Sequence, residues 1–192
     1  MNFVTQYDDI LNLLNKYNPV EYSNTRNYID GNVSYLSPYI SRGILSTKRV
    51  MDHILSLGYP RQKVEKFIQE LAWRDYWQNS WQCIKNIDDD VKHNQIDVHH
   101  FNIPKSVRFG LTGIKAIDTG ITSLKKNGYM HNHLRMYVAA LCCNFGHSHW
   151  LTPAKWMFYH LYDGDWASNA LSWQWVAGTN SNRKYVFNQE NV

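Results

Sequence analysis

The stretch DGDWASNALSWQWVAGT, residues 163–179, decides the fold of this chain. Taken alone, Asp163-Gly164-Asp165 is a turn that precedes a helix. The residues after it contain no glycine or proline until Gly178, which favours one continuous helix. We therefore expect a helix from about Asp165 to Ala177, followed by a polar tail.

Working outward, short helices punctuated by caps, prolines and glycines account for most of the remaining chain. The expected helices cover residues 10–17, a short segment with Ser37 as N-cap and Pro38 at its first position, a segment from the cap Ser46 to Gly58, and residues 60–84, 114–128, 130–145 and 153–163. Residues 18–31 and 86–111 are expected to be irregular. No strand-like alternation or repeat occurs.

These patterns predict an all-α fold, a compact irregular helical bundle, as a single domain over residues 1–192. Within it, residues 1–21 form an N-terminal helix and linker and residues 180–192 a polar tail. A hydrophobic content of 44% with 19% charged residues argues against disorder. The net charge of +4 permits a polyanionic partner without deciding for one.

The ends of the chain and its cysteines indicate the compartment. The acidic start lacks the basic region of a signal peptide, and no apolar run is long enough to span a bilayer. Cys83, Cys142 and Cys143 form no CxxC pair and are predicted to be free thiols. We expect a cytoplasmic protein without membrane contact.

The longest expected helix, residues 60–84, has two unusual faces. One side is expected to be apolar and carries Val64, Phe67, Ile68, Leu71, Ala72 and Tyr76. On the other, a carboxylate and three indoles recur at helical spacing: Glu70, Trp73, Trp77 and Trp81. Indoles on a face that would otherwise be solvated indicate an interface or the wall of a site.

Two histidine pairs raise the question of a metal site, namely His131-x-His133 and His147-x-His149. Side chains two positions apart on a helix point to nearly opposite faces, so neither pair chelates a metal if it is helical. We expect no metal site.

Three segments together resemble the FAD-binding domain of the DNA photolyase/cryptochrome family. They are SYLSPYISRGILS at 34–46, ELAWRDYW at 70–77, and GYMHNHLRM at 128–136, which continues through Trp150 to the stretch at 163–179. The resemblance extends from Tyr22 to Asn188 and implies a helical domain that holds FAD in a bent conformation. The cofactor contacts it implies are Tyr22, Ser34, Leu36, Ser37, Phe67, Arg74, Asn132, Arg135, Asp163, Asp165 and Asn169.

The resemblance also implies light-driven electron transfer from reduced flavin to a cyclobutane pyrimidine dimer in DNA, with the protein supplying binding and orientation. The residues matching the pocket for the flipped dimer are Glu70, Trp73, Asn132, Met136 and Trp175. Trp173 and Trp150 match the inner and middle members of the chain of indoles that reduces the flavin. The implied DNA contacts are Arg26, Glu70, Trp73, His133 and Trp175.

Several departures from the family pattern accompany these matches. The antenna domain and the C-terminal helical extension have no counterpart, so we expect a short stand-alone form, with a homodimer or partner protein covering the exposed faces. Val33 stands where a phosphate-contacting threonine is usual. His133 and Tyr185 fall near positions where photolyases use arginine, and fewer cations imply weaker DNA binding.

The outer tryptophan of this electron-conducting chain, or relay, would fall between His93 and Leu111, where no tryptophan occurs. Either Trp156 or Tyr137 completes the path, or an external reductant is needed. Three interpretations stay open: a light-dependent DNA repair lyase, a cryptochrome-like flavin photosensor without repair activity, and a subunit or remnant that needs a partner chain. We place repair first.

Overall fold

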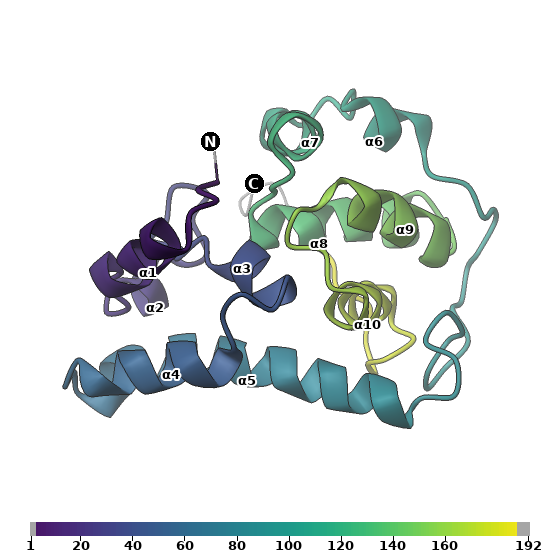
Figure 1. Ribbon diagram of the computed structural model, residues 1–192. Helices are drawn as coiled ribbons and strands as arrows, with labels where there is room; N and C mark the ends of the chain where they lie inside the picture. Colours follow the sequence, from purple (N-terminus) through teal and green to yellow (C-terminus); the bar gives the residue numbers. More distant parts are fainter. Residues whose placement is uncertain (1–2, 188–192) are drawn as a thin grey trace. The chain divides into compact units, whose positions relative to one another are not determined.

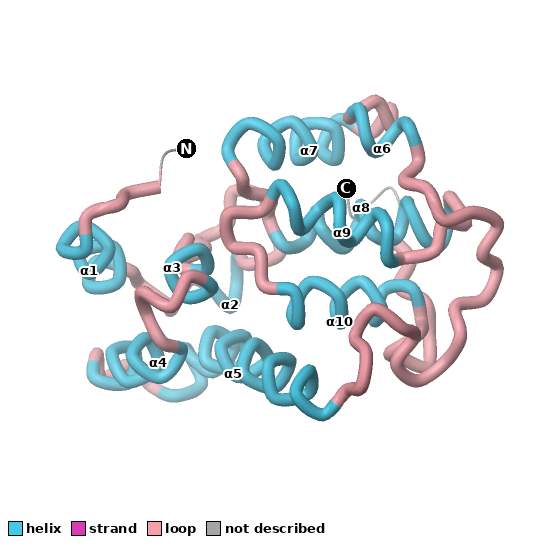
Figure 2. Tube along the Cα trace, turned by 45° about the vertical axis from the view of Figure 1, so that its right-hand side comes forward, coloured by secondary structure: helices cyan, strands magenta, loops and turns pink. Residues whose placement is uncertain are grey.

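The computed structural model describes residues 3–187, and within them it contains helices and loops with no strand (Figure 1; Figure 2). The helices are α1 (Tyr7–Lys16), α2 (Tyr22–Thr25), α3 (Ser37–Ser41), α4 (Thr47–Ser56), α5 (Arg61–Cys83), α6 (Lys105–Phe109), α7 (Lys115–Asn127), α8 (Asn132–Ala140), the π-helical turn η1 (Leu141–Phe145), α9 (Leu151–His160) and α10 (Trp166–Ala177). The predicted all-α class is confirmed.

The chain divides into two compact units, residues 1–77 and 78–192, so that α5 contributes to both. In the first unit, one apolar cluster collects side chains from α1, α3, α4 and the first turns of α5. Ile10, Leu36, Val50 and Val64 are each at most 1% exposed within it. The amphipathic spacing of α1 and α4 supplies these faces.

The second unit packs α8 against α7, η1 and α10, with α9 also lying against α10 (Figure 2). Small residues allow this close approach: Ala139, Ala140, Ala154, Ala167 and Ala170 are all buried. Gly120 lies so close to Leu134 that a Cβ atom there would be 2.7 Å from Leu134 Cδ1. The core therefore depends on small side chains facing large ones.

Most of the predicted helix ends are confirmed. Ser46 caps α4 by accepting a hydrogen bond from the Arg49 amide (3.0 Å), and Gly128 ends α7 with φ +66°. The expected loop at residues 18–31 contains α2, and the one at 86–111 contains α6, so both predictions were wrong in part. A four- or five-residue helix lacks the length for a periodic pattern to show.

Two finer predictions were also wrong. Ser37 is the first residue of α3 and Leu36 is its N-cap, so Pro38 takes the second position. Ala72 and Tyr76 were expected on the apolar face of α5, yet both are exposed, Tyr76 to 53%. Over the 23 residues of α5, the buried residues Val64, Phe67 and Leu71 all lie in the N-terminal half.

The state of the cysteines and the expected lack of a membrane span were also predicted. Cys83, Cys142 and Cys143 are free thiols, the first exposed and the other two buried. Among the described residues, no helix is both long and apolar enough to cross a membrane. Of the expected polar tail, residues 188–192 lie outside the described part.

Replacing Gly128 with alanine is expected to lower the free energy of unfolding by about 2–3 kcal/mol, from a left-handed backbone and a steric clash. A Cβ atom at Gly128 would stand 2.5 Å from Tyr162 Cγ, at a point where the Tyr162 amide donates to the Gly128 carbonyl (2.8 Å). The measurement is urea unfolding followed by circular dichroism.

The control is Gly58→Ala, because Gly58 has a similar φ of +71° and a Cβ atom added there would meet nothing within 4 Å. It is expected to cost only the conformational part, about 1 kcal/mol. Equal losses in the two variants would show that the Tyr162 ring yields without cost.

Candidate functional site

A largely buried ion pair in the second unit joins α8 to the segment before α10. Arg135, on α8, donates through Nη2 to both carboxylate oxygens of Asp163, at 3.0 and 2.8 Å, and through Nε to the Met130 carbonyl (2.8 Å). The Asp163 side chain is 4% exposed and that of Arg135 22%. Because the pair is largely shielded from water, it holds the segment before α10 against the start of α8.

The second aspartate of the same motif has a different task. Asp165 is the N-cap of α10, accepting from the Ser168 amide and hydroxyl at 3.2 Å, and it also accepts from Gln78 Nε2 at 2.6 Å. Its carboxylate therefore fixes the first turn of α10. Asn169 follows in that turn and donates from Nδ2 to the Ala154 carbonyl on α9 (3.0 Å), which fixes the orientation of its amide.

The start of α8 presents further polar groups. Asn132 is exposed at the first position of this helix, and His131, its N-cap, accepts the His133 amide through Nδ1 (3.2 Å). Burial, with the charges of His133 and Arg135, lowers the pKa of His131, which keeps the imidazole neutral. His131 Nε2 is buried and has no hydrogen-bond partner within residues 3–187.

In the first unit, the predicted cofactor residues lie around a buried ring. Phe67 is 5% exposed and packs edge-on against Tyr22, with ring centroids 5.3 Å apart. Burial, together with nearby Glu70, raises the pKa of Tyr22 to about 12, so its phenol stays protonated. Ser34 accepts the Leu36 amide through Oγ (3.3 Å), and Leu36 is fully buried.

The remaining predicted residues of this unit lie at the surface or at its edge. Ser37 opens α3, where its carbonyl accepts the Ser41 hydroxyl (2.9 Å). Arg74 is half-buried on α5. Arg26 forms an ion pair with Glu70 at 2.5 Å, so the predicted DNA-contact cation and the predicted lesion-contact carboxylate are joined.

The indole face of α5 forms an exposed aromatic cluster. Trp73 is 50% exposed and stacks on Trp77, with ring centroids 5.2 Å apart and planes 27° from parallel. Tyr76 packs against both rings. Trp73 therefore offers a flat, supported surface beside Glu70 on the same helix.

The predicted lesion and DNA residues of the second unit are also accessible. Trp175 is 41% exposed and lies 5.6 Å from the Tyr185 ring, while Met136 is half-buried on α8. His133 meets the Tyr137 ring edge-on at 5.3 Å. Each unit thus carries part of the predicted set.

The two predicted relay indoles are deeply buried. Trp173 on α10 is 2% exposed, and Trp150, the N-cap of α9, is 0% exposed. The indole Nε1 of Trp150 donates to Asp90 Oδ1 at 2.7 Å. Sequence reasoning missed Asp90, because residues 86–111 offered only a polar composition and no partner.

The aromatic groups nearest to Trp150 bear on the predicted outer relay position. The His149 ring lies 5.8 Å from Trp150, and Phe101 stacks on His149 at 5.1 Å and is 65% exposed. Trp156 packs against His160, and Tyr137 against Phe187. Phe101 therefore extends the line of ring contacts from Trp150 through His149 to the surface, within the segment where the outer tryptophan would fall.

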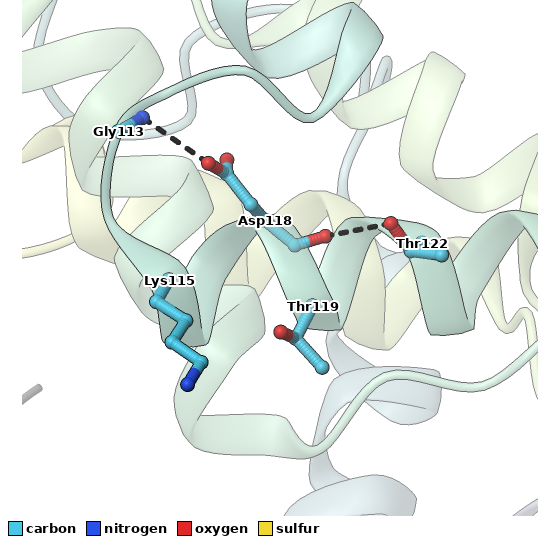
Figure 3. Close-up of a pocket in the computed structure, with 5 residues that line it drawn as sticks. All are labelled: Gly113, Lys115, Asp118, Thr119 and Thr122. Atoms are coloured by element: carbon cyan, nitrogen blue, oxygen red, sulfur yellow. Dashed lines mark hydrogen bonds between the residues drawn. The ribbon is translucent and has the colours of Figure 1, made fainter.

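A separate pocket, shown in Figure 3, lies at the start of α7 and contains none of the predicted site residues. It is lined by Gly113, Lys115, Asp118, Thr119 and Thr122. The Asp118 carboxylate already accepts the Gly113 and Thr112 amides, so it ties the loop before α7 to the first turn of that helix. No group of three or more metal-ligating side chains occurs within residues 3–187.

Comparison with known proteins gives this arrangement its context. A family model described as the FAD binding domain of DNA photolyase matches residues 67–192, more than half of the chain. The deoxyribodipyrimidine photo-lyase of Vibrio cholerae is 30% identical over 154 residues, covering 76% of this chain and 33% of that protein. The protein of the same name from Buchnera aphidicola is 33% identical over 162 residues, covering 77% and 33%.

Solved structures of photolyases and cryptochromes also resemble this chain in fold. A class III photolyase from Agrobacterium tumefaciens matches with a TM-score of 0.82 and 26% identity, over 95% of this chain and 40% of that one. A Synechocystis cryptochrome matches with a TM-score of 0.85 over 98% of this chain and 42% of that one, and at 24% identity it shows the fold alone.

The chain spans about a third of the length of the curated relatives it matches. The match to the family model begins at Phe67, in α5 of the first unit, and runs through the whole second unit. The chain belongs to the family of the FAD-binding domain of DNA photolyases.

Proposed function

We propose that this chain binds FAD and supports light-driven repair of cyclobutane pyrimidine dimers in DNA. The observation that carries the proposal is the buried Arg135–Asp163 pair, with the Asp165 cap and the oriented Asn169 amide directly after it. A guanidinium, two carboxylates and an amide suit the polar edge of a flavin and a ribose.

The other groups present also suit such a cofactor. The buried His131 Nε2 is a polar atom that a bound dinucleotide would satisfy. In the first unit, Ser34, Ser37 and Arg74 offer hydroxyl and guanidinium donors for a pyrophosphate, and the Tyr22–Phe67 pair offers apolar surface. Bound and reduced, FAD would supply a light-excited electron donor.

For the DNA substrate, the chain offers stacking surfaces and polar groups. Trp73, supported by Trp77, and Trp175, supported by Tyr185, are rings on which a flipped dimer would stack. Glu70, Asn132 and Met136 would contact its edges. Arg26 and His133 would contact phosphate, Arg26 by exchanging its bond to Glu70.

Replacing Glu70 with glutamine is expected to lower the rate of dimer repair roughly 10–100-fold, the equivalent of one hydrogen bond to a charged group. FAD binding should be unchanged. The measurement is illumination of the reduced, FAD-loaded chain with an oligonucleotide containing one dimer, followed by strand analysis. Glu65→Gln, an exposed carboxylate on the same helix, is the control and should repair normally.

The second candidate is a flavin photosensor without repair, which the Arg26–Glu70 pair favours because it ties a phosphate-binding cation to the lesion-facing carboxylate. Retained FAD and photoreduction without any repair by the unsubstituted chain would establish it. A chain that leaves FAD free in equilibrium dialysis would refute both candidates.

A further inference from the structure

We propose that Asp90 accepts the indole proton of Trp150 when Trp150 is oxidised, so that the oxidised relay is held as a neutral radical. The inference rests on the proposed function and on the sequence-based expectation of an indole relay, in which Trp150 passes an electron to Trp173 and the flavin, before it is reduced, is the final acceptor. It adds a proton acceptor to that electron path.

The geometry of the Trp150 indole is the first support. Its Nε1–H donates to Asp90 Oδ1 at 2.7 Å, at the short end for a bond to a carboxylate, and the tryptophan is 0% exposed. An indole radical cation at this position has no water to stabilise its charge. The carboxylate is therefore both the counter-ion and the nearest base.

The surroundings hold Asp90 in place. The Oδ2 atom of Asp90 accepts a hydrogen bond from the backbone amide of Gln95 at 2.7 Å, and the side-chain Oε1 of Gln95 accepts one from the backbone amide of Trp150 at 2.9 Å. Together with the indole bond, these contacts close a ring of hydrogen bonds through Trp150, Asp90 and Gln95. The adjacent residue, Val91, donates its amide to the buried Gln174 Oε1 (2.9 Å) on α10. The acceptor is thus fixed from both sides, which favours proton transfer without rearrangement.

The same helices connect Trp150 to Trp173. Asn169 lies on α10 one helical turn before Trp173. Its side chain donates to the carbonyl of Ala154, in the first turn of α9. Trp150 is the N-cap of α9, and Gln174 follows Trp173 directly. Both indoles therefore stand on elements that are hydrogen-bonded to each other within the second unit.

Between Trp150 and the surface, the neighbouring side chains can carry a proton but are poor electron donors. His149 and then Phe101 lead outward, and a phenyl ring is harder to oxidise than an indole, so the oxidising equivalent stays on Trp150. His149 Nε2 lies 3.5 Å from Asp90 Oδ1, and each side chain is 15–17% exposed. A proton on Asp90 is therefore close to the surface.

Trp150 gives one electron to oxidised Trp173, its Nε1–H bond breaks, and the proton joins Asp90 Oδ1. The products are a neutral indolyl radical and a neutral carboxylic acid. When an external reductant returns one electron to Trp150, the proton moves back and the starting pair is restored.

The test is flash photolysis of the FAD-loaded chain, reading the absorption of the indolyl radical, which differs between its neutral and cationic forms. The unsubstituted chain should give the neutral form, with formation slowed in D₂O. In Asp90→Asn the radical should stay cationic and recombine roughly tenfold faster. An Asp90→Asn chain that forms the neutral radical at the unsubstituted rate would overturn the proposal.

Asp88→Asn is the matched control, because Asp88 accepts a hydrogen bond from the indole of Trp166 (3.0 Å) in the same segment. It removes an equal charge from a second indole and should leave the radical unchanged. Trp150→Phe should abolish the signal. The D₂O measurement needs no substitution, so radical formation at an unchanged rate in D₂O would overturn the proposal even where a variant folds poorly.

A readout independent of the cofactor is the indole N–H resonance of Trp150, assigned by its loss in Trp150→Phe. It should lie downfield in the unsubstituted chain and move upfield in Asp90→Asn alone. If the chain holds no FAD, the proposed function falls together with this inference. If light reduces the flavin through Trp150 but Asp90→Asn changes nothing, only the proton acceptor falls.

Discussion

A chain carrying Gln174→Leu is expected to lose about 3–5 kcal/mol of its free energy of unfolding, the sum of several buried groups left unpaired. Gln174 is 0% exposed on α10. Its Nε2 donates to the Ile87 and Asp89 carbonyls at 3.1 and 3.2 Å, and its Oε1 accepts from the Val91 amide and the Thr179 hydroxyl. Leucine fills the same volume and restores none of these bonds.

The measurement is urea unfolding, with amide hydrogen exchange at Val91 as the local readout. Exchange at Val91 should become fast before the rest of the second unit opens. Gln69→Leu on the exposed face of α5 makes the same chemical change and should stay within about 0.5 kcal/mol of the parent. Protection of Val91 that persists in Gln174→Leu would contradict the role given to this side chain.

Asp163→Ala should lower the free energy of unfolding by about 3 kcal/mol, because it leaves the guanidinium of Arg135 without its carboxylate in a site where that guanidinium is only 22% exposed. The Arg135 bond to the Met130 carbonyl remains and limits the loss. Thermal unfolding followed by circular dichroism measures the effect, and FAD affinity by equilibrium dialysis should fall as well.

The comparison variant is Asp52→Ala, which breaks the i,i+4 pair with Lys48, whose side chains are 77% and 52% exposed. That pair is expected to contribute at most about 0.5 kcal/mol. A double-mutant cycle with Arg135→Leu isolates the coupling between Arg135 and Asp163. A coupling near zero would mean that Asp163 stabilises the fold through other contacts.

Helix ends were the features that the sequence predicted best, because each depends on a few neighbouring residues. Ser46 and Gly128 act as cap and stop at the predicted places, and the turn Asp163-Gly164-Asp165 does precede α10. The interactions involved span at most five residues, which is the range that local patterns report.

The parts that could not be predicted depend on contacts between distant residues. The bond of Gln174 to Val91 spans 83 positions and that of Asp90 to Trp150 spans 60, and neither position has a local signature of burial. The π-helical turn after α8 inserts one wide turn, with the Gly146 amide bonded to the Leu141 carbonyl (2.8 Å). From the sequence, residues 130–145 were predicted to form one ordinary α-helix, because the hydrophobic spacing gives no sign of the wider turn.

The candidate site divides in the same way. Family motifs assigned roles to Arg135, Asp163 and Asn169, and the structure adds which atoms of these side chains are already bonded. It also joins Arg26 to Glu70, residues 44 positions apart that the motifs treated separately. The motif therefore predicts residue identity, while the folded chain decides which groups remain available.

The unequal exposure of the three thiols offers a chemical handle on the molecule. Burial raises the pKa of Cys142 and Cys143, so neither ionises readily, whereas Cys83 lies exposed in the last turn of α5. A fluorescent maleimide dye would accordingly attach at Cys83 without any cysteine being removed first. Resonance energy transfer from such a label to a bound flavin would report the distance between them in solution.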